Sequence, residues 1–169
     1  GNWIDEHMPL GNKLQKFWLK KCTSKLTKVT VNGNWDHVRD NVLAFENPCL
    51  DKNDRTIGKS IVQEKKIEKK RVFCFVGALN EHKGVHLILE ALKQFQEDNI
   101  EFHFVGDSSE RKSYENTAKE LKCKITFHGF LSKEKTKDVY SKSNFILLPS
   151  RSEGFPKVIA EAMNFGCYP

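Results

Sequence analysis

The sequence has no C-x-x-C pair, no N-x-S/T sequon and no apolar run near the roughly 20 residues that cross a membrane. Its five cysteines are odd in number and far apart, which argues against a disulfide framework and against a zinc ribbon. Residues 1–10 contain no apolar segment of the kind found in signal peptides. We therefore expect a cytoplasmic protein in a reducing compartment.

The chain also lacks the composition of collagen-like, low-complexity and disordered proteins. Apolar residues make up 38% and charged residues 30% of its 169 positions, which suits one domain with a buried core. Residues 1–70 carry 14 basic and 9 acidic side chains, whereas residues 71–169 carry 14 and 13. The nearly neutral second part argues against a nucleic-acid-binding surface. The early basic excess is typical of solvated surface, and also of contact with a membrane or an anionic ligand.

Strands and helices alternate in the second part of the chain. Short apolar segments predict four strands, at residues 71–76, 100–105, 124–128 and 144–148. Helical spacing and capping residues predict the helices between and after them, at residues 85–95, 108–122, 132–142 and 156–166. The alternation predicts an α/β fold, a Rossmann-like parallel sheet with flanking helices. The first three strands each end in a glycine at the carboxyl edge, where open parallel sheets bind ligands.

The first 70 residues give a weaker pattern. An apolar stripe predicts a helix at Leu10, Leu14, Phe17 and Trp18. We expect this stripe to pack on a core with its lysines reaching outward, and a membrane-surface helix is the alternative. Further segments are predicted as a strand near 29–31, a helix over 35–45 and a polar linker or insertion over 48–70.

The segment 150–163 carries the clearest chemical signal. A glycine loop leads from a strand end into a helix N-terminus, where free N–H groups and the helix dipole favour a phosphate. Glu153 and Glu161 lie on either side of the helix start. A carboxylate repels phosphates but accepts hydrogen bonds from sugar hydroxyls, so the combination suits a nucleoside diphosphate sugar. The alternative is that Glu153 caps the first turn and Glu161 is a solvated helix residue.

A second loop, residues 77–84, also joins a strand to a helix. Lys83 in this loop is predicted to point to the same sheet edge, where an ammonium can balance a diphosphate. The alternative is an ordinary surface lysine. His82 and His86 have no third ligand at zinc spacing, so no metal site is expected. The strand histidines are predicted to be packing residues, His103 and His128.

Together these segments resemble the donor-binding C-terminal domain of the GT-B fold retaining glycosyltransferases of family 4, the glycosyl transferases group 1. The matching segments follow the family's order, at residues 75–84, 104–107, 125–129 and 148–163. The resemblance implies a two-domain architecture, with its parts at 1–47 (tail of the acceptor-side domain), 48–70 (linker or insertion) and 71–169 (partial nucleotide-sugar-binding domain). Because the sequence begins at Gly1 and stops where a further strand is expected, we expect a fragment that is inactive alone.

The resemblance also implies roles for single residues. Glu161 is expected to bind the ribose hydroxyls, and Glu153 and Lys83 are the catalytic candidates, at the transferred sugar and the diphosphate. The remaining binding candidates come from loops that meet the sugar, the phosphate or the base: Gly77, Gly154, Phe155 and Phe130. The implied donor is a UDP-, GDP- or ADP-sugar, and no other cofactor and no metal is implied. The implied partners are a saccharide or lipid-linked acceptor and a peripheral membrane contact, without nucleic acid.

The resemblance implies hexosyl transfer with retention, in cell-surface polysaccharide or lipopolysaccharide synthesis at the inner face of a membrane. The alternatives are a non-catalytic GT-B nucleotide-sugar-binding scaffold and a GT-B nucleotide-sugar epimerase or phosphorylase. The sequence departs from the family at Ala78, where an arginine commonly binds the phosphates. Lys157 and Arg151 flank the helix start and are the candidates to replace that charge.

Overall fold

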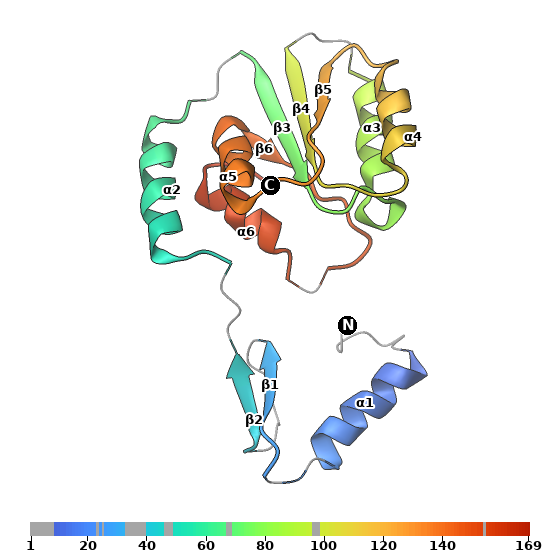
Figure 1. The fold of residues 1–169 in the computed structure, drawn as a ribbon, viewed down its shortest axis with the longest axis vertical. Helices are drawn as coiled ribbons and strands as arrows, with labels where there is room; N and C mark the ends of the chain where they lie inside the picture. The colour runs from blue at the N-terminus through green and yellow to red at the C-terminus, as the bar shows by residue number, and fades with distance from the viewer. Residues whose placement is uncertain are drawn as a thin grey trace. The chain divides into compact units, whose positions relative to one another are not determined.

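The computed structural model describes residues 9–22, 24, 26–32, 40–45, 49–66, 69–95, 99–153 and 155–169. The chain divides into two compact units, Gly1–Pro48 and Cys49–Pro169, and each is described by itself. The first unit contains α1 (Leu10–Lys21) and a parallel pair of strands, β1 (Val29–Asn32) and β2 (Val42–Phe45) (Figure 1). The predicted helix at the start of the chain and the predicted strand near 29–31 are therefore confirmed.

Two expectations for the first unit are not met. The helix predicted over 35–45 is wrong at β2, where backbone pairing with β1 and the strand preference of valine outweigh a weak helical pattern. The rest of that predicted helix falls partly on residues 33–39, which lie outside the described residues. On α1, Leu14, Phe17 and Trp18 are more than half exposed, so the predicted packing of this stripe on a core is not observed.

The second unit is built on one four-stranded parallel sheet. Its strands stand in the order β5-β4-β3-β6 and are β3 (Arg71–Val76), β4 (Ile100–Val105), β5 (Lys124–Phe127) and β6 (Phe145–Ile146). Its helices are α2 (Lys52–Glu64), the 3₁₀ turn η1 (Glu81–Lys83), α3 (Val85–Lys93), α4 (Arg111–Ala118), α5 (Lys133–Lys142) and α6 (Lys157–Asn164). The predicted parallel α/β sheet with flanking helices is confirmed, although β6 is shorter than expected.

Both faces of the sheet are buried, as expected for strands with continuous apolar runs. One apolar cluster joins Phe75 and Phe104 to residues of α3. The other cluster lies on the opposite face and joins Cys74 and Val105 to residues of α5 and α6. Figure 1 shows α3 and α4 on one side of the sheet and α5 and α6 on the other. The alternation of Cys74 and Phe75 along β3 separates the two clusters.

Helix α2 lies within the segment that the sequence predicts as a linker or insertion. The apolar pattern of this segment does not indicate the helix. It begins with a capping box, because Asp51 Oδ1 accepts from Asp54 N at 2.7 Å and Asp54 Oδ2 accepts from Asp51 N at 3.2 Å. The fully buried Asp54 then forms ion pairs with Lys133 and Lys137 of α5. These two lysines hold the pKa of Asp54 well below its ordinary value. The ion pairs of this buried carboxylate, together with Ile61 packed on the second apolar cluster, attach α2 to the sheet unit.

Lys65, just after α2, caps the ends of two other helices. Its Nζ donates to Tyr140 O at 3.0 Å and to Phe165 O at 2.8 Å, near the ends of α5 and α6. The same Nζ lies 3.8 Å from Cys167 Sγ. Partial burial lowers the pKa of Lys65. The carbonyls at these helix ends therefore have a charged donor in place of water.

Candidate functional site

The glycine-ended strands meet at the carboxyl edge of the sheet. Gly77 N donates to Val105 O at 3.0 Å, and Gly106 N donates to Gly129 O at 2.9 Å. A Cβ on Gly106, whose φ is +131°, would lie only 1.9 Å from Gly77 O. Such close backbone contact requires glycine at position 106. The loop that follows Gly77 therefore starts directly at the edge where open parallel sheets bind ligands.

Lys83 and Glu153 meet at this edge although they are 70 residues apart in the sequence. The Nζ atom of Lys83 lies 2.5 Å from Glu153 Oε1, and the two side chains are 27% and 25% exposed. Lys83 is positioned by η1, where Asn80 Oδ1 accepts from Lys83 N at 3.0 Å. Glu153 comes from the loop between β6 and α6. A cation and a carboxylate predicted separately thus form one half-buried ion pair.

The environment of Glu153 keeps its carboxyl group ionised. Burial raises the pKa of Glu153, but the hydrogen bond from Lys83 and the charge of Lys83 outweigh burial. The net result is a pKa below the ordinary value for glutamate. At neutral pH this group is therefore a hydrogen-bond acceptor, as binding of hydroxyl groups requires.

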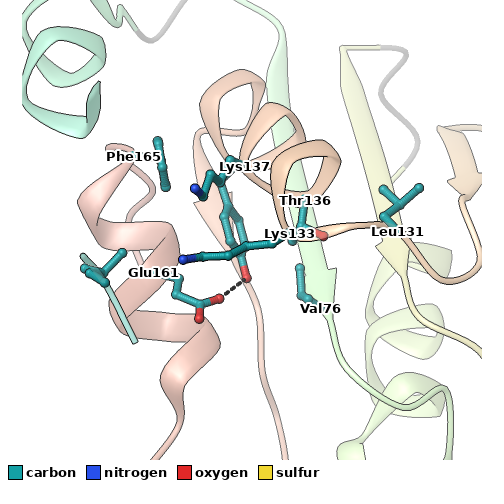
Figure 2. Close-up of a pocket in the computed structure, with 9 residues that line it drawn as sticks. Val76, Leu131, Lys133, Thr136, Lys137, Glu161 and Phe165 are labelled. Atoms are coloured by element: carbon teal, nitrogen blue, oxygen red, sulfur yellow. Dashed lines mark hydrogen bonds between the residues drawn. The ribbon is translucent and has the colours of Figure 1, made fainter. Parts of the chain in front are cut away.

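Glu161 faces a separate cavity of about 180 Å³ between α5 and α6. Figure 2 shows Glu161 from α6 and the lysines of α5 around the same space. Tyr140 donates its hydroxyl to Glu161 Oε2 at 3.3 Å, and burial raises the pKa of Glu161. The rest of the wall combines apolar side chains and polar tips: Leu50, Val76, Leu131, Phe165, Lys133, Thr136 and Lys137. The cavity can enclose a small ring-shaped group and offers a carboxylate to its hydroxyls.

The other predicted binding residues lie on exposed loops beside these groups. Phe130 is 83% exposed and precedes Leu131 of the cavity wall, and Phe155 is 55% exposed just before α6. Gly154 lies outside the described residues. The first turn of α6 contains no acidic residue, and no side chain caps it. Lys157 N donates to Phe155 O at 2.9 Å and Ile159 N to Pro156 O at 3.0 Å, so an anion can meet the remaining N–H groups of this helix start.

The two candidates for the charge missing at Ala78 differ in their surroundings. Arg151 Nη2 donates to Glu81 Oε1 at 2.6 Å in an exposed ion pair. Lys157 makes no ion pair with any residue that the structure describes, and its charge acts on Glu161 to lower that carboxyl's pKa, against the stronger effect of burial. Lys157 thus lies close to the predicted ribose-binding carboxylate.

Sequence reasoning missed the contribution of α5 to the cavity. Lys133, Thr136, Lys137 and Tyr140 lie three or four residues apart, so they share one face of the helix. The spacing could have identified this face, although it gives no sign of what the face packs against. Only the packing of α5 beside α6 brings it to Glu161.

The two strand histidines, His103 and His128, take no part in either group. His103 Nδ1 lies 3.0 Å from His128 Nε2, and burial lowers the pKa of both side chains, which are packing residues of β4 and of the end of β5. Over the described ranges, no three His, Cys, Asp or Glu side chains gather as ligands of a metal ion would. None of the helices described here is long and apolar enough to cross a membrane.

Comparisons with known proteins identify a family for this chain. The family model described as glycosyl transferases group 1 matches residues 57–169. The GalNAc-alpha-(1->4)-GalNAc-alpha-(1->3)-diNAcBac-PP-undecaprenol alpha-1,4-N-acetyl-D-galactosaminyltransferase of Campylobacter jejuni is 29% identical over 122 residues, 70% of this chain and 32% of that protein. An uncharacterized glycosyltransferase of Haemophilus influenzae is 29% identical over 133 residues, 75% of this chain and 34% of that protein. The chain therefore spans about a third of the length of these relatives.

A solved structure with a similar fold is that of the lipopolysaccharide outer core galactosyltransferase WaaB in its apo form. The match has a TM-score of 0.53 and 26% identity, and it covers 61% of this chain and 30% of WaaB. The cholesterol-alpha-glucosyltransferase of Helicobacter pylori matches with a TM-score of 0.50 and 17% identity, over 55% of this chain and 58% of that structure. The second match concerns the fold alone.

Proposed function

Since the chain belongs to the glycosyl transferases group 1 family and has the fold of GT-B glycosyltransferases, we propose that it forms the donor-binding part of a retaining enzyme of family 4. The enzyme transfers a sugar from a nucleoside diphosphate sugar to an acceptor hydroxyl. The anomeric carbon forms a bond with the acceptor oxygen and loses its bond to the diphosphate oxygen. The electron pair leaves with the diphosphate, and the acceptor proton is released to base or solvent.

The observation that carries this proposal is the meeting of Lys83 and Glu153 at the carboxyl edge of the sheet. The ammonium of Lys83 suits a diphosphate whose negative charge increases as it leaves. Glu153, kept ionised, suits the hydroxyl groups of the sugar that is transferred. The N-terminus of α6 offers further donors to the diphosphate. These residues supply the positive charge that a metal ion supplies in other enzymes, so we propose no metal cofactor.

Glu161 and its cavity are the proposed site of the nucleoside. The carboxylate accepts hydrogen bonds from the ribose hydroxyls, and Leu131 and Val76 supply apolar wall. Phe130 adds backbone groups and an exposed ring next to that wall, where a uracil, guanine or adenine base can bind. Phe155 and Gly154 are proposed to meet the sugar and the phosphate, and Gly77 is proposed to let the loop approach them.

The acceptor and the surroundings of the whole protein are proposed from its relatives. The Campylobacter relative is named for an undecaprenol-linked acceptor, and WaaB for the lipopolysaccharide outer core. We propose a saccharide or lipid-linked acceptor in cell-surface polysaccharide synthesis, at the cytoplasmic face of a membrane. Residues 1–47 are proposed as the tail of the acceptor-side domain and 48–70 as the connection to the donor domain. Because this chain spans about a third of its relatives, we expect it to bind donor without transferring the sugar.

Binding of nucleotides by this chain tests the proposal. We expect ligand-detected NMR with UDP, GDP and ADP to show binding that prefers one base. Glu161→Ala should weaken that binding about tenfold or more, because it removes hydrogen bonds to a charged group. Glu90→Ala, on the exposed face of α3, is the matched control and should bind as the unchanged chain does. Failure of a chain folded by circular dichroism to bind any of the three nucleotides contradicts the proposed function.

A further inference from the structure

The lysine proposed to hold the diphosphate already has a partner. Lys83 Nζ lies 2.5 Å from Glu153 Oε1, and about three quarters of each side chain is buried. A diphosphate that takes Lys83 must draw this ammonium away from Glu153 or share it. An inference about this contact rests on the proposed function, because it concerns the same site.

The two loops that carry this pair are joined independently of it. Arg151 N donates to His82 O at 3.1 Å, which connects the loop before α6 to η1. Asn80 Oδ1 accepts from Lys83 N at 3.0 Å and fixes the backbone beneath the lysine. Both contacts involve backbone groups and leave the Lys83 and Glu153 side chains out. The side chains can therefore separate and meet again without a change in how the loops lie.

Separation leaves Glu153 without its strongest hydrogen-bond donor. The carboxylate is half-buried and ionised, so it repels a diphosphate that binds beside it. An intact donor carries sugar hydroxyl groups that can donate to Glu153 and replace the lost bond. A nucleoside diphosphate lacks the transferred sugar, and so it lacks the hydroxyl groups that would donate to Glu153. The cost of separating the pair therefore differs between the donor and the product of the transfer.

We propose that Glu153 competes with the diphosphate for Lys83, and that this competition makes the site prefer the nucleotide sugar to the bare nucleoside diphosphate. When the donor binds, Lys83 turns to the diphosphate and Glu153 accepts from the sugar hydroxyls. When the sugar has been transferred, Glu153 loses those donors and takes Lys83 back. The product nucleotide is then released more easily. Glu153 is thus a specificity-determining residue for donor over product.

Calorimetric titration of the full chain tests this proposal. UDP, GDP and ADP are first compared to find the preferred base, and that nucleotide is then compared with its glucose conjugate. Glu153→Gln keeps the size of the side chain and removes its charge. We expect this variant to bind the bare nucleotide about threefold to tenfold more tightly than the unchanged chain, the range of a half-buried ion pair. The nucleotide sugar should gain no affinity, so the preference for the donor shrinks.

According to the proposal, the higher affinity of Glu153→Gln for the bare nucleotide depends on the presence of Lys83. In a Lys83→Gln background, Glu153→Gln should raise the affinity for the bare nucleotide clearly less than it does with Lys83 present, because only the repulsion by the carboxylate is then relieved. Glu115→Gln is the charge-matched control. Glu115 Oε1 pairs with Arg111 Nε at 2.7 Å, and the two side chains are similarly half-buried, at 36% and 28% exposed. The same gain in the Glu115→Gln variant would mean a general effect of net charge and would overturn the proposal.

The outcomes separate this inference from the function on which it rests. Unchanged or weaker binding of the bare nucleotide by Glu153→Gln, with binding by the unchanged chain, overturns the competition alone. Absence of nucleotide binding by a folded, unchanged chain overturns the proposed function and the competition together. Circular dichroism and thermal unfolding of each variant exclude a loss of fold as the cause of a weaker signal.

Discussion

Single charged side chains connect several helices and loops of the second unit that are distant in the sequence. Asp54 connects α2 to α5 through two lysines, and Lys65 connects the end of α2 to the ends of α5 and α6. At the proposed diphosphate site, Lys83 connects the loop after β3 to the loop after β6. In each case the partners are 70 or more residues apart. Residue chemistry that looks like ordinary surface charge in the sequence is therefore part of the tertiary structure.

The charge missing at Ala78 leads to a prediction for Lys157 and Arg151. Arg151 is already paired with Glu81 on the exposed surface, whereas Lys157 begins α6 without an ion pair to a described residue. We expect Lys157→Glu to weaken nucleotide diphosphate binding about tenfold, because it places a negative charge at the anion-facing end of the helix. Arg151→Glu should change the affinity less than about twofold. Calorimetry on both variants checks this, and a larger loss for Arg151→Glu would reverse the assignment.

The sequence predicts the residues of the site unequally well. Lys83, Glu153 and Glu161 lie in local loop and helix patterns whose chemistry can be recognised without the fold. Tyr140 was missed because its hydroxyl meets Glu161 only after α5 and α6 pack together. The contact between Lys83 and Glu153 was expected only as a common sheet edge, since spacing cannot give a distance between two loops. Local chemistry is thus predictable, and its pairing across elements is not.

Among the elements, the caps and the apolar runs were the reliable signals. The helix predicted over 132–142 does begin at a capping residue, because Ser132 Oγ accepts from Lys135 N at 3.3 Å. The strands β3 and β4 follow the predicted ranges closely because residues on both of their faces are buried. Helix α2 escaped prediction because its buried residues are Asp54 and Gly58, and its few large apolar residues are only partly buried or exposed. Its capping box, Asp51 with Asp54, was the available signal.

The contact between α2 and α6 leads to a prediction for Gly58. A Cβ at this position would lie 2.3 Å from Asn164 O and 2.2 Å from Asn164 Nδ2. We expect Gly58→Ala to lower the free energy of unfolding by about 1–3 kcal/mol, because overpacking outweighs the better helix propensity of alanine. Denaturant unfolding measures the change.

Helix α1 supplies the control for that substitution. Gly11 also lies in a helix, but a Cβ there would meet nothing within 4 Å. Gly11→Ala should therefore leave the free energy of unfolding unchanged or raise it by up to about 1 kcal/mol. Equal destabilisation by both substitutions would mean that the close approach of α2 to α6 is not the cause.

At the scale of the whole molecule, the boundary between the two units lies between Pro48 and Cys49. The sequence pattern places the start of the nucleotide-binding domain at residue 71, where the regular strands begin. The difference is helix α2, whose Asp54 contacts Lys133 and Asn164 of the second unit. Both apolar clusters also lie in Cys49–Pro169, and the family match begins at residue 57. The second unit therefore contains its own core.

This division predicts that residues 49–169 fold without the first unit. We expect this shortened chain to unfold in one cooperative thermal transition and to bind the preferred nucleotide within about twofold of the full chain. A chain shortened to residues 71–169 lacks α2 and Lys65, and it should be less stable because it loses the partners of Lys133 and of the helix-end carbonyls. Equal melting temperatures for the two shortened chains would contradict this role of α2.

During synthesis, β6 is the last of the four strands to emerge from the ribosome. One edge of β3 therefore has no strand partner until β6 appears. β3, β4 and β5 emerge in turn and can pair as they appear, whereas β6 pairs with β3 from the other side only after α5 has emerged. Asp54 and Lys65 are synthesised before their partners, which follow 75 or more residues later in the chain. Being charged, they stay hydrated until those partners emerge. The ion pairs that hold α2 thus also suit vectorial synthesis.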